Sequence, residues 1–138
     1  MASDPDCIFC KIVAGELPAT IIDEGERAIA FMDLQPAGRG HALVIPRAHA
    51  ADIHAIEPED LQAVAVMARG IAARQRSVLG ADGVNLLNSN GAAAWQTVFH
   101  FHMHVIPRYE GDPLRLPWRP APGDMDAIAA AGAKLKAG

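Results

Sequence analysis

Three histidines recur at every second residue in one short segment: His100, His102 and His104, within FHFHMHVIP. Side chains on a strand alternate between its two faces, so this spacing predicts three imidazoles on one face and apolar side chains on the other. Three interpretations follow, namely a solvated strand face, a tri-histidine catalytic metal site, and nucleophilic attack by one neutral imidazole. Tri-histidine metal sites usually draw ligands from different strands, and no neighbouring carboxylate supplies a base. These two points weigh against the metal site, and the residues alone leave the choice between metal site and nucleophile open.

The chain's two cysteines, Cys7 and Cys10, form a second reactive motif close to the N-terminus. At this spacing, a metal half-site or a redox pair is favoured over a structural disulfide. A thioredoxin-like redox motif would follow a strand, which this position does not. Half of a zinc site is the preferred interpretation, and a pair of reduced thiols is the alternative.

The elements that position these residues are mostly short strands. Turn signals and apolar runs predict strands over 20–23, 28–32, 41–45, 83–88 and 99–107, with a loop over 89–96. From Pro58 to Leu79 the apolar spacing is helical, with Pro58 suited to the first turn and Gly80 to the stop. The residues expected on its apolar face are Leu61, Val64, Ala68, Ile71, Ala72 and Val78.

Both ends of the chain differ from this middle part. A short helix is expected over 7–16, an extended proline-rich stretch over 111–124 and an alanine-rich helix over 125–136. There is no internal repeat and no interdomain linker. The prediction is an α+β fold with about five mostly antiparallel strands and one long helix on one face.

Composition excludes several classes of protein. The 138 residues suit one domain, and 51% hydrophobic with 20% charged residues argues against disorder. A net charge of −4, with no long basic run, argues against nucleic-acid binding. The polar start carries no signal-peptide pattern and no apolar stretch approaches a membrane span, so we expect a soluble, cytoplasmic protein with no membrane partner.

The chain resembles the histidine triad (HIT) family, whose signature is His-φ-His-φ-His-φ-φ with φ apolar. Residues 100–106 match it completely, flanked by Gln96-Thr97-Val98-Phe99 and Pro107-Arg108. The resemblance continues upstream through IFCKI (8–12), GELPA (15–19), AFMD (30–33) and GHALVIP (40–46). It implies a HIT-like fold with a HIT domain over 7–108, or as far as about residue 118. A C-terminal extension over 109–138 would follow.

This resemblance implies a covalent mechanism. His102 would attack the α-phosphate of a nucleotide to form a nucleotidyl-histidine, which water hydrolyses to a nucleoside monophosphate. Nδ1 of His102 would donate its hydrogen to the main-chain carbonyl of His100, so that the other nitrogen attacks. His104 and His41 would lie beside the phosphate and complete the catalytic set with His100.

The resemblance also implies a substrate pocket. Asp33 would accept hydrogen bonds from the ribose hydroxyls, although on its own it reads as a turn residue. For the residues expected to contact phosphate, the alternative is an ordinary turn between strands. For the apolar residues expected in the base pocket, the alternative is the hydrophobic core. The family position before Gln96 is commonly glycine, so Trp95 departs from the pattern and leaves the acceptable leaving group open. The expected phosphate contacts are Thr97, Gln96 and Asn90, and the expected base pocket is Phe9, Ile12, Leu17, Phe31 and Leu34.

For the cysteine pair, the resemblance implies a structural zinc completed by His49 and His100. Neither a catalytic metal nor an organic cofactor is expected. His54 matches no motif and is interpreted as a surface histidine.

The resulting prediction is a homodimeric phosphoramidase-type hydrolase acting on purine nucleoside phosphoramidates. The two sheets would join edge to edge, and the tail around Trp118 would reach the partner's active site. Dinucleoside polyphosphates are the second substrate class. The rivals are a nucleotide-binding regulatory module with negligible turnover and a tri-histidine metallohydrolase, whose activity chelators would abolish.

Overall fold

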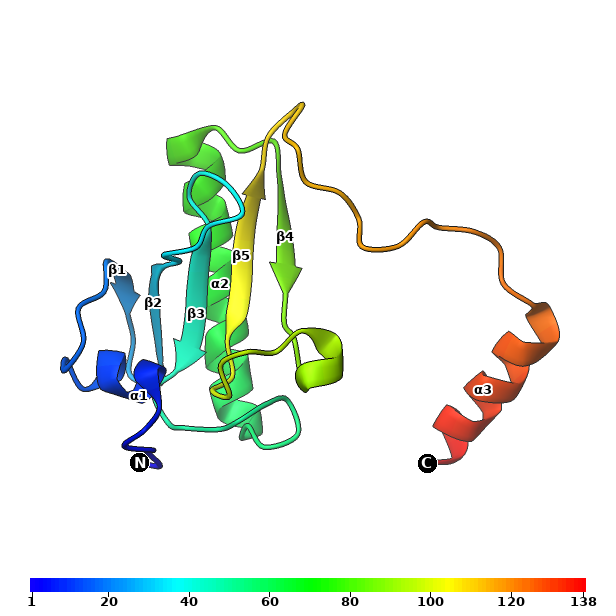
Figure 1. Ribbon diagram of the computed structural model, residues 1–138, viewed down its shortest axis with the longest axis horizontal. Coiled ribbons are helices and arrows are strands. Elements are labelled where there is room, and N and C mark those ends of the chain that lie inside the picture. The colour runs from blue at the N-terminus through cyan, green and yellow to red at the C-terminus, as the bar shows by residue number, and fades with distance from the viewer.

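Five strands form one antiparallel sheet in the computed structural model, which describes residues 1–138 (Figure 1). The spatial order is β1-β2-β3-β5-β4, so β5 enters between β3 and β4. The predicted α+β architecture is confirmed, with strand boundaries that shift by a few residues. The strands are β1 (Ile21–Glu24), β2 (Ala28–Met32), β3 (Ala42–Pro46), β4 (Gly83–Leu87) and β5 (Met103–Arg108).

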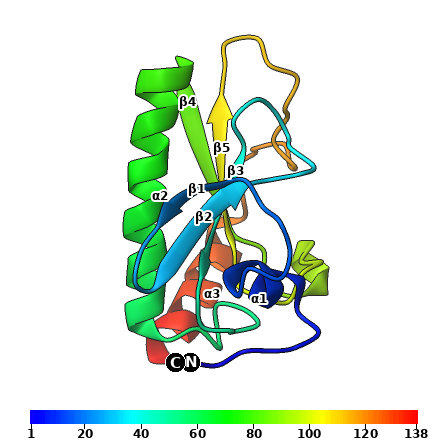
Figure 2. The same cartoon turned by 90° about the vertical axis from the view of Figure 1, so that its left-hand side faces the viewer.

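One long helix, α2 (Pro58–Leu79), crosses one face of the sheet (Figure 2). It begins at Pro58 and ends at Gly80, whose φ of 70° is the left-handed conformation typical of a helix stop. Val64, Ala68 and Ile71 pack into the main core with strand residues, as their spacing predicts. The prediction was wrong for Val78, which is 76% exposed and lies in the last turn of the helix.

A short helix, α1 (Ile8–Val13), lies on the side of the sheet opposite α2 (Figure 2). Its Phe9 and Cys10 pack with Phe31 of β2 and Leu43 of β3 in a second apolar cluster. The sheet is thus covered on both faces near β2 and β3, and the N-terminal cysteines are carried into the interior.

The largest departure from prediction concerns the histidine segment. β5 begins only at Met103, so His100 and His102 precede the strand instead of lying on it. The backbone N–H of Phe101 donates to the carbonyl of Ala50 in a loop, at 2.7 Å, and not to a neighbouring strand. The three imidazoles therefore do not share one strand face. Phe101 and Val105 do pack against α2, as expected of the apolar positions.

The C-terminal part runs away from the sheet (Figure 1). It is extended over residues 111–124 and ends in α3 (Met125–Ala137), which has no buried residue. No helix in the structure combines the length and the apolar character required to cross a membrane.

Candidate active site

The connection between β2 and β3 places two polar side chains at the end of the sheet. Asp33 directly follows β2 and His41 directly precedes β3, and the Asp33 N–H donates to the His41 carbonyl at 3.1 Å. Gly40 permits the approach: its φ is +87°, and a Cβ there would collide with the side chain of Leu79. The carboxylate and the imidazole therefore face the same region.

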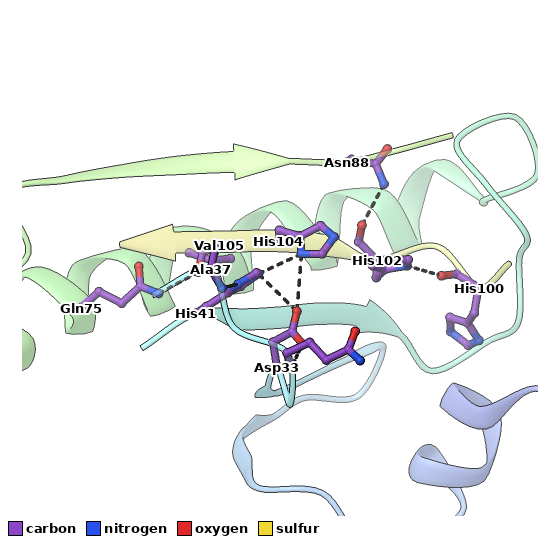
Figure 3. Close-up of polar contacts among 10 residues, drawn as sticks. Asp33, Ala37, His41, Gln75, Asn88, His100, His102, His104 and Val105 are labelled. Carbon is purple, nitrogen blue, oxygen red and sulfur yellow. Dashed lines mark hydrogen bonds and ion pairs between the residues drawn. The ribbon is translucent and has the colours of Figure 1, made fainter. Parts of the chain in front are cut away.

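Strand β5 adds His104 to this pair (Figure 3). In the sheet register His104 lies opposite Leu43 of β3 and Leu87 of β4. Its Nδ1 lies 2.9 Å from Nε2 of His41 and 3.9 Å from Oδ2 of Asp33. The same Asp33 oxygen lies 3.4 Å from Nε2 of His41. We call Asp33, His41 and His104 the pocket group.

A backbone amide determines the tautomers within the pocket group. The Ala37 N–H donates to Nδ1 of His41 at 2.9 Å, so this nitrogen must carry a lone pair. The neutral His41 ring then carries its hydrogen on Nε2 and donates it to Nδ1 of His104. His104 in turn keeps its own hydrogen on Nε2.

His102 is oriented by its own segment. Its Nδ1 lies 2.8 Å from the carbonyl oxygen of His100, which can only accept, so Nδ1 carries the hydrogen and Nε2 the lone pair. The expected hydrogen bond between these residues is confirmed. The amide of Asn88 donates to the His102 carbonyl at 2.9 Å and anchors the backbone (Figure 3).

Burial lowers the pKa of all four of these imidazoles. For His100 and His104 the pKa falls to about 4, with the nearby rings of other histidines adding to the effect of burial. For His41 and His102 burial again dominates in lowering the pKa, while the charge of Asp33 partly opposes it. The rings are therefore neutral near pH 7, the form in which an imidazole is a nucleophile.

These groups surround a pocket of about 760 Å³. A second hollow of about 740 Å³, beside α2 and the β1–β2 turn, is lined by no histidine or cysteine and offers no comparable chemistry. Ten of the predicted site residues line the larger pocket: His41, His102, His104, Asp33, Thr97, Phe9, Ile12, Leu17, Phe31 and Leu34.

Two of the predicted phosphate contacts, Gln96 and Asn90, are not among the residues that line the pocket. The buried Gln96 amide donates to the Ala51 carbonyl, and its oxygen accepts from the Gly91 N–H. Oδ1 of Asn90 accepts from the Ile53 N–H. Both side chains shape the loop that carries Thr97 instead of facing a ligand.

His100, also in the predicted catalytic set, has its ring elsewhere. Its Nδ1 lies 3.4 Å from Sγ of Cys7 and 3.5 Å from Sγ of Cys10, and Nδ1 of His49 lies 3.3 Å from Sγ of Cys10. The four donor atoms lie within 4.8 Å of one another. We call Cys7, Cys10, His49 and His100 the cysteine group.

The cysteine group has the chemistry of a structural metal site. Nε2 of His100 donates to the Pro46 carbonyl at 2.8 Å, which leaves the Nδ1 lone pair facing the sulfurs. Two sulfurs and two imidazole nitrogens are a set that zinc accepts in tetrahedral sites. Burial raises the pKa of the Cys7 thiol, so a cation would be needed to favour its thiolate. These residues could hold a metal ion.

The donor atoms of the pocket group also lie within 4.8 Å of one another, but they do not fit a metal. The Ala37 N–H occupies Nδ1 of His41, so Nε2 holds the hydrogen and offers no lone pair. The imidazoles of His100, His102 and His104 do not converge either, since the first faces the cysteines. The geometry therefore gives no support to a tri-histidine metal site.

Gln75, a buried residue of α2 whose side chain supports the pocket, was not predicted from the sequence. Its amide donates to the carbonyl of Gly40 at 3.0 Å. It also donates to the carbonyl of Val105 at 2.9 Å (Figure 3). These carbonyls belong to the neighbours of His41 and His104, so one side chain of α2 ties both segments together. A signal existed: Gln75 follows Ile71 by four residues and is a polar residue on the buried face.

Fold and site together define an α+β protein with a buried histidine pocket beside a Cys₂His₂ group. A model of the HIT domain matches residues 14–111, and the chain belongs to the HIT family. A HIT-like protein of Mycoplasma genitalium is 46% identical over 104 residues, covering 75% of this chain and 74% of the other. An adenosine 5'-monophosphoramidase of Candida albicans is 35% identical over 142 residues, covering 99% and 93%.

Solved structures show the same fold. The structure of SMU.412c from Streptococcus mutans has a TM-score of 0.92 at 32% identity, covering 98% of this chain and 86% of the other. A Zn-bound histidine triad family protein from Mycobacterium smegmatis has a TM-score of 0.76 at 41% identity, covering 96% of each chain.

Proposed function

We propose that this protein hydrolyses purine nucleoside 5'-phosphoramidates through a covalent intermediate on His102. The observation that carries the proposal is the hydrogen bond from Nδ1 of His102 to the His100 carbonyl, which leaves the Nε2 lone pair on a neutral ring that lines the pocket. The similarity to an adenosine 5'-monophosphoramidase supports the choice of substrate.

In the first step, Nε2 of His102 attacks phosphorus and the phosphorus–nitrogen bond breaks. The leaving amine takes up a proton from solvent as the bond breaks, and Nε2 of His104, where the hydrogen bonds of the pocket group place a hydrogen, donates a hydrogen bond to the phosphate. His102 becomes a phosphoryl-imidazolium whose Nδ1 hydrogen stays on the His100 carbonyl, which favours the positively charged ring.

In the second step, water attacks phosphorus and the bond to Nε2 of His102 breaks. The proton of the attacking water passes to solvent, the ring of His102 returns to its neutral form, and a nucleoside monophosphate leaves. His41 keeps His104 in the required tautomer throughout, through its 2.9 Å contact.

The rest of the pocket suits a nucleoside. Phe9 and Phe31 meet edge to face with ring centroids 5.4 Å apart, and Phe9 also packs against the ring of His102 at 5.2 Å. An apolar slot beside the nucleophile suits a base. Asp33 keeps one oxygen on the Gln35 N–H, at 2.8 Å, which fixes the carboxylate that we assign to the ribose hydroxyls.

The test is hydrolysis of adenosine 5'-phosphoramidate in EDTA, followed as release of AMP. We expect turnover by the wild type and by His54→Ala, an exposed-histidine control, and none by His102→Ala. Turnover that survives His102→Ala would exclude this mechanism. A folded wild type that binds AMP without turnover would favour the binding-module alternative, and selective cleavage of dinucleoside polyphosphates would favour that substrate class.

We also propose that the cysteine group holds a structural zinc. Its support is the inward Nδ1 of His100 and the likeness to a protein described as Zn-bound. When bound, the ion would link α1 to the histidine segment and take no part in the reaction. Elemental analysis of purified protein should give one zinc per chain, and a chain without metal that is equally stable would contradict the proposal.

A homodimer is our third proposal. Strand β4 is one of the two edge strands of the sheet and is exposed along its whole length, including Val84, Leu86 and Leu87. An exposed apolar edge of this kind favours pairing with a second copy. Light scattering should give twice the chain mass, and a monomer at micromolar concentration would refute the proposal.

A further inference from the structure

Trp95 is the one non-glycine residue of the chain with a positive φ, at 73°. It ends the short 3₁₀ turn over Ala92–Ala94, a position where glycine adopts this conformation without cost. Its side chain is also 65% exposed, so packing within the chain does not account for it. Neither the backbone conformation nor packing in the core therefore accounts for a tryptophan at this position.

Trp95 is one of the residues that line the pocket. One end of the pocket is built by α1 and β2, with Phe9, Ile12 and Phe31. Ser89, Trp95 and Thr97, from the connection between β4 and β5, also line the pocket, and none of these three side chains is charged. Figure 1 shows α1 and the turn before Trp95 on opposite sides of the start of β5, where the histidines lie.

We infer that Trp95 forms the wall of a leaving-group subsite for flat, uncharged aromatic amines. The inference rests on the proposed function. If the nucleoside occupies the end at α1 and phosphorus lies at His102, the leaving group, which departs opposite the nucleophile, lies beside Trp95. Stacking on an exposed indole favours an aromatic group, and the lack of a carboxylate among Ser89, Trp95 and Thr97 disfavours a cation.

The first test compares two substrates. Adenosine 5'-phosphoramidate carries an unsubstituted amine, and its N-benzyl derivative carries an aromatic one. We expect the ratio of kcat/KM, benzyl over unsubstituted, to fall about tenfold in Trp95→Gly and to recover largely in Trp95→Phe. The Tm of Trp95→Gly should equal or exceed that of the wild type, because glycine relieves the left-handed backbone. A structural role alone would lower the Tm and leave the ratio unchanged.

The second test measures binding without turnover. In a His102→Ala, Trp118→Phe background, Trp95 is the only tryptophan, because the chain has two. The N-benzyl compound should change its fluorescence more than the unsubstituted compound does. Equal changes, or an unaltered ratio in Trp95→Gly, would overturn the subsite.

Two further results separate the competing explanations. If Trp95→Gly shifts the molecular mass measured by light scattering, Trp95 packs against a second copy and the subsite is refuted. If the wild type hydrolyses neither compound, the proposed function fails, and the fluorescence titration still decides the subsite.

Discussion

Two groups of side chains in this molecule gather histidines within 4.8 Å of other ligand atoms, yet their chemistry differs. In the cysteine group, the outer nitrogen of His100 donates to a carbonyl and leaves its lone pair facing the sulfurs. In the pocket group, the corresponding nitrogen of His41 accepts from a backbone N–H, so the inner nitrogen carries a hydrogen. The partner of the second ring nitrogen, more than the distance between donors, decides whether such a group suits a metal or a proton.

The largest effect should come from removing the nucleophile. His102→Ala should lower single-turnover hydrolysis about 10⁴-fold or more, because no other imidazole is held with a free lone pair toward the pocket. Its metal content should stay at the wild-type value, since His102 belongs to neither ligand set. A variant that loses metal together with activity would show that the two groups are not separable.

The reverse experiment removes a ligand of the cysteine group. Cys10→Ser should abolish metal binding and lower the free energy of unfolding by several kcal/mol, because binding to such a site is coupled to folding. Turnover of the folded fraction should fall far less than in His102→Ala. Elemental analysis, chemical denaturation and activity per folded molecule would check this, with His54→Ala as the control. A metal-free variant of unchanged stability would contradict it.

Gln75 connects the pocket group to α2 and should contribute to stability. Gln75→Leu removes the donor from two buried carbonyls and should lower the free energy of unfolding by about 2 kcal/mol. Urea denaturation measures this loss, and the metal content should not change. Val78→Ala, at an exposed position of the same helix, is the matched control. Equal stability of Gln75→Leu and wild type would mean that water replaces the amide.

The Ala37 N–H tests most directly whether the partner of the second ring nitrogen decides between binding a metal and holding a proton. Ala37→Pro deletes the donor to Nδ1 of His41, so either tautomer becomes available, and we expect turnover to fall about tenfold. The pocket group should then bind Zn²⁺, and added Zn²⁺ should inhibit the variant more than the wild type. Ala37→Gly keeps the N–H and should behave as the wild type. Equal zinc sensitivity of all three proteins would refute our tautomer assignment.

The smallest predicted effect on stability concerns an ion pair that lies outside both groups. Arg108 holds the pKa of Asp112 well below its usual value of 3.8. The folded pKa lies below the unfolded one, so the stabilisation is complete above about pH 3.8 and is lost as the pH falls below it. Asp112→Asn should lower the Tm slightly at pH 7, and the difference should vanish in acid. A difference independent of pH would contradict the ion pair.

The fold was largely predictable because its signals are local. The spacing of Val64, Ala68 and Ile71 predicts a buried helix face, and turn signals with apolar runs predict the strands. The start of β5 was not predictable, because the Phe101 N–H bonds to Ala50 in a distant loop. The ligand set at Cys7 and Cys10 and most pocket residues followed from the family resemblance. The roles of Gln75 and the Ala37 N–H could not, because each depends on a contact between segments brought together only by folding.

His100 has two roles: its ring lies in the cysteine group, and its carbonyl accepts a hydrogen bond from the nucleophile His102. Cys10 and His100 are 90 residues apart in the chain, and Cys10 and His49 are 39 apart. During synthesis the cysteines leave the ribosome early and must wait for most of the sheet before their last imidazole arrives. The nucleophile is fixed by that same late residue. A truncated chain that ends before residue 100 therefore has neither the complete cysteine group nor an oriented nucleophile, so both require the synthesis of the same residue.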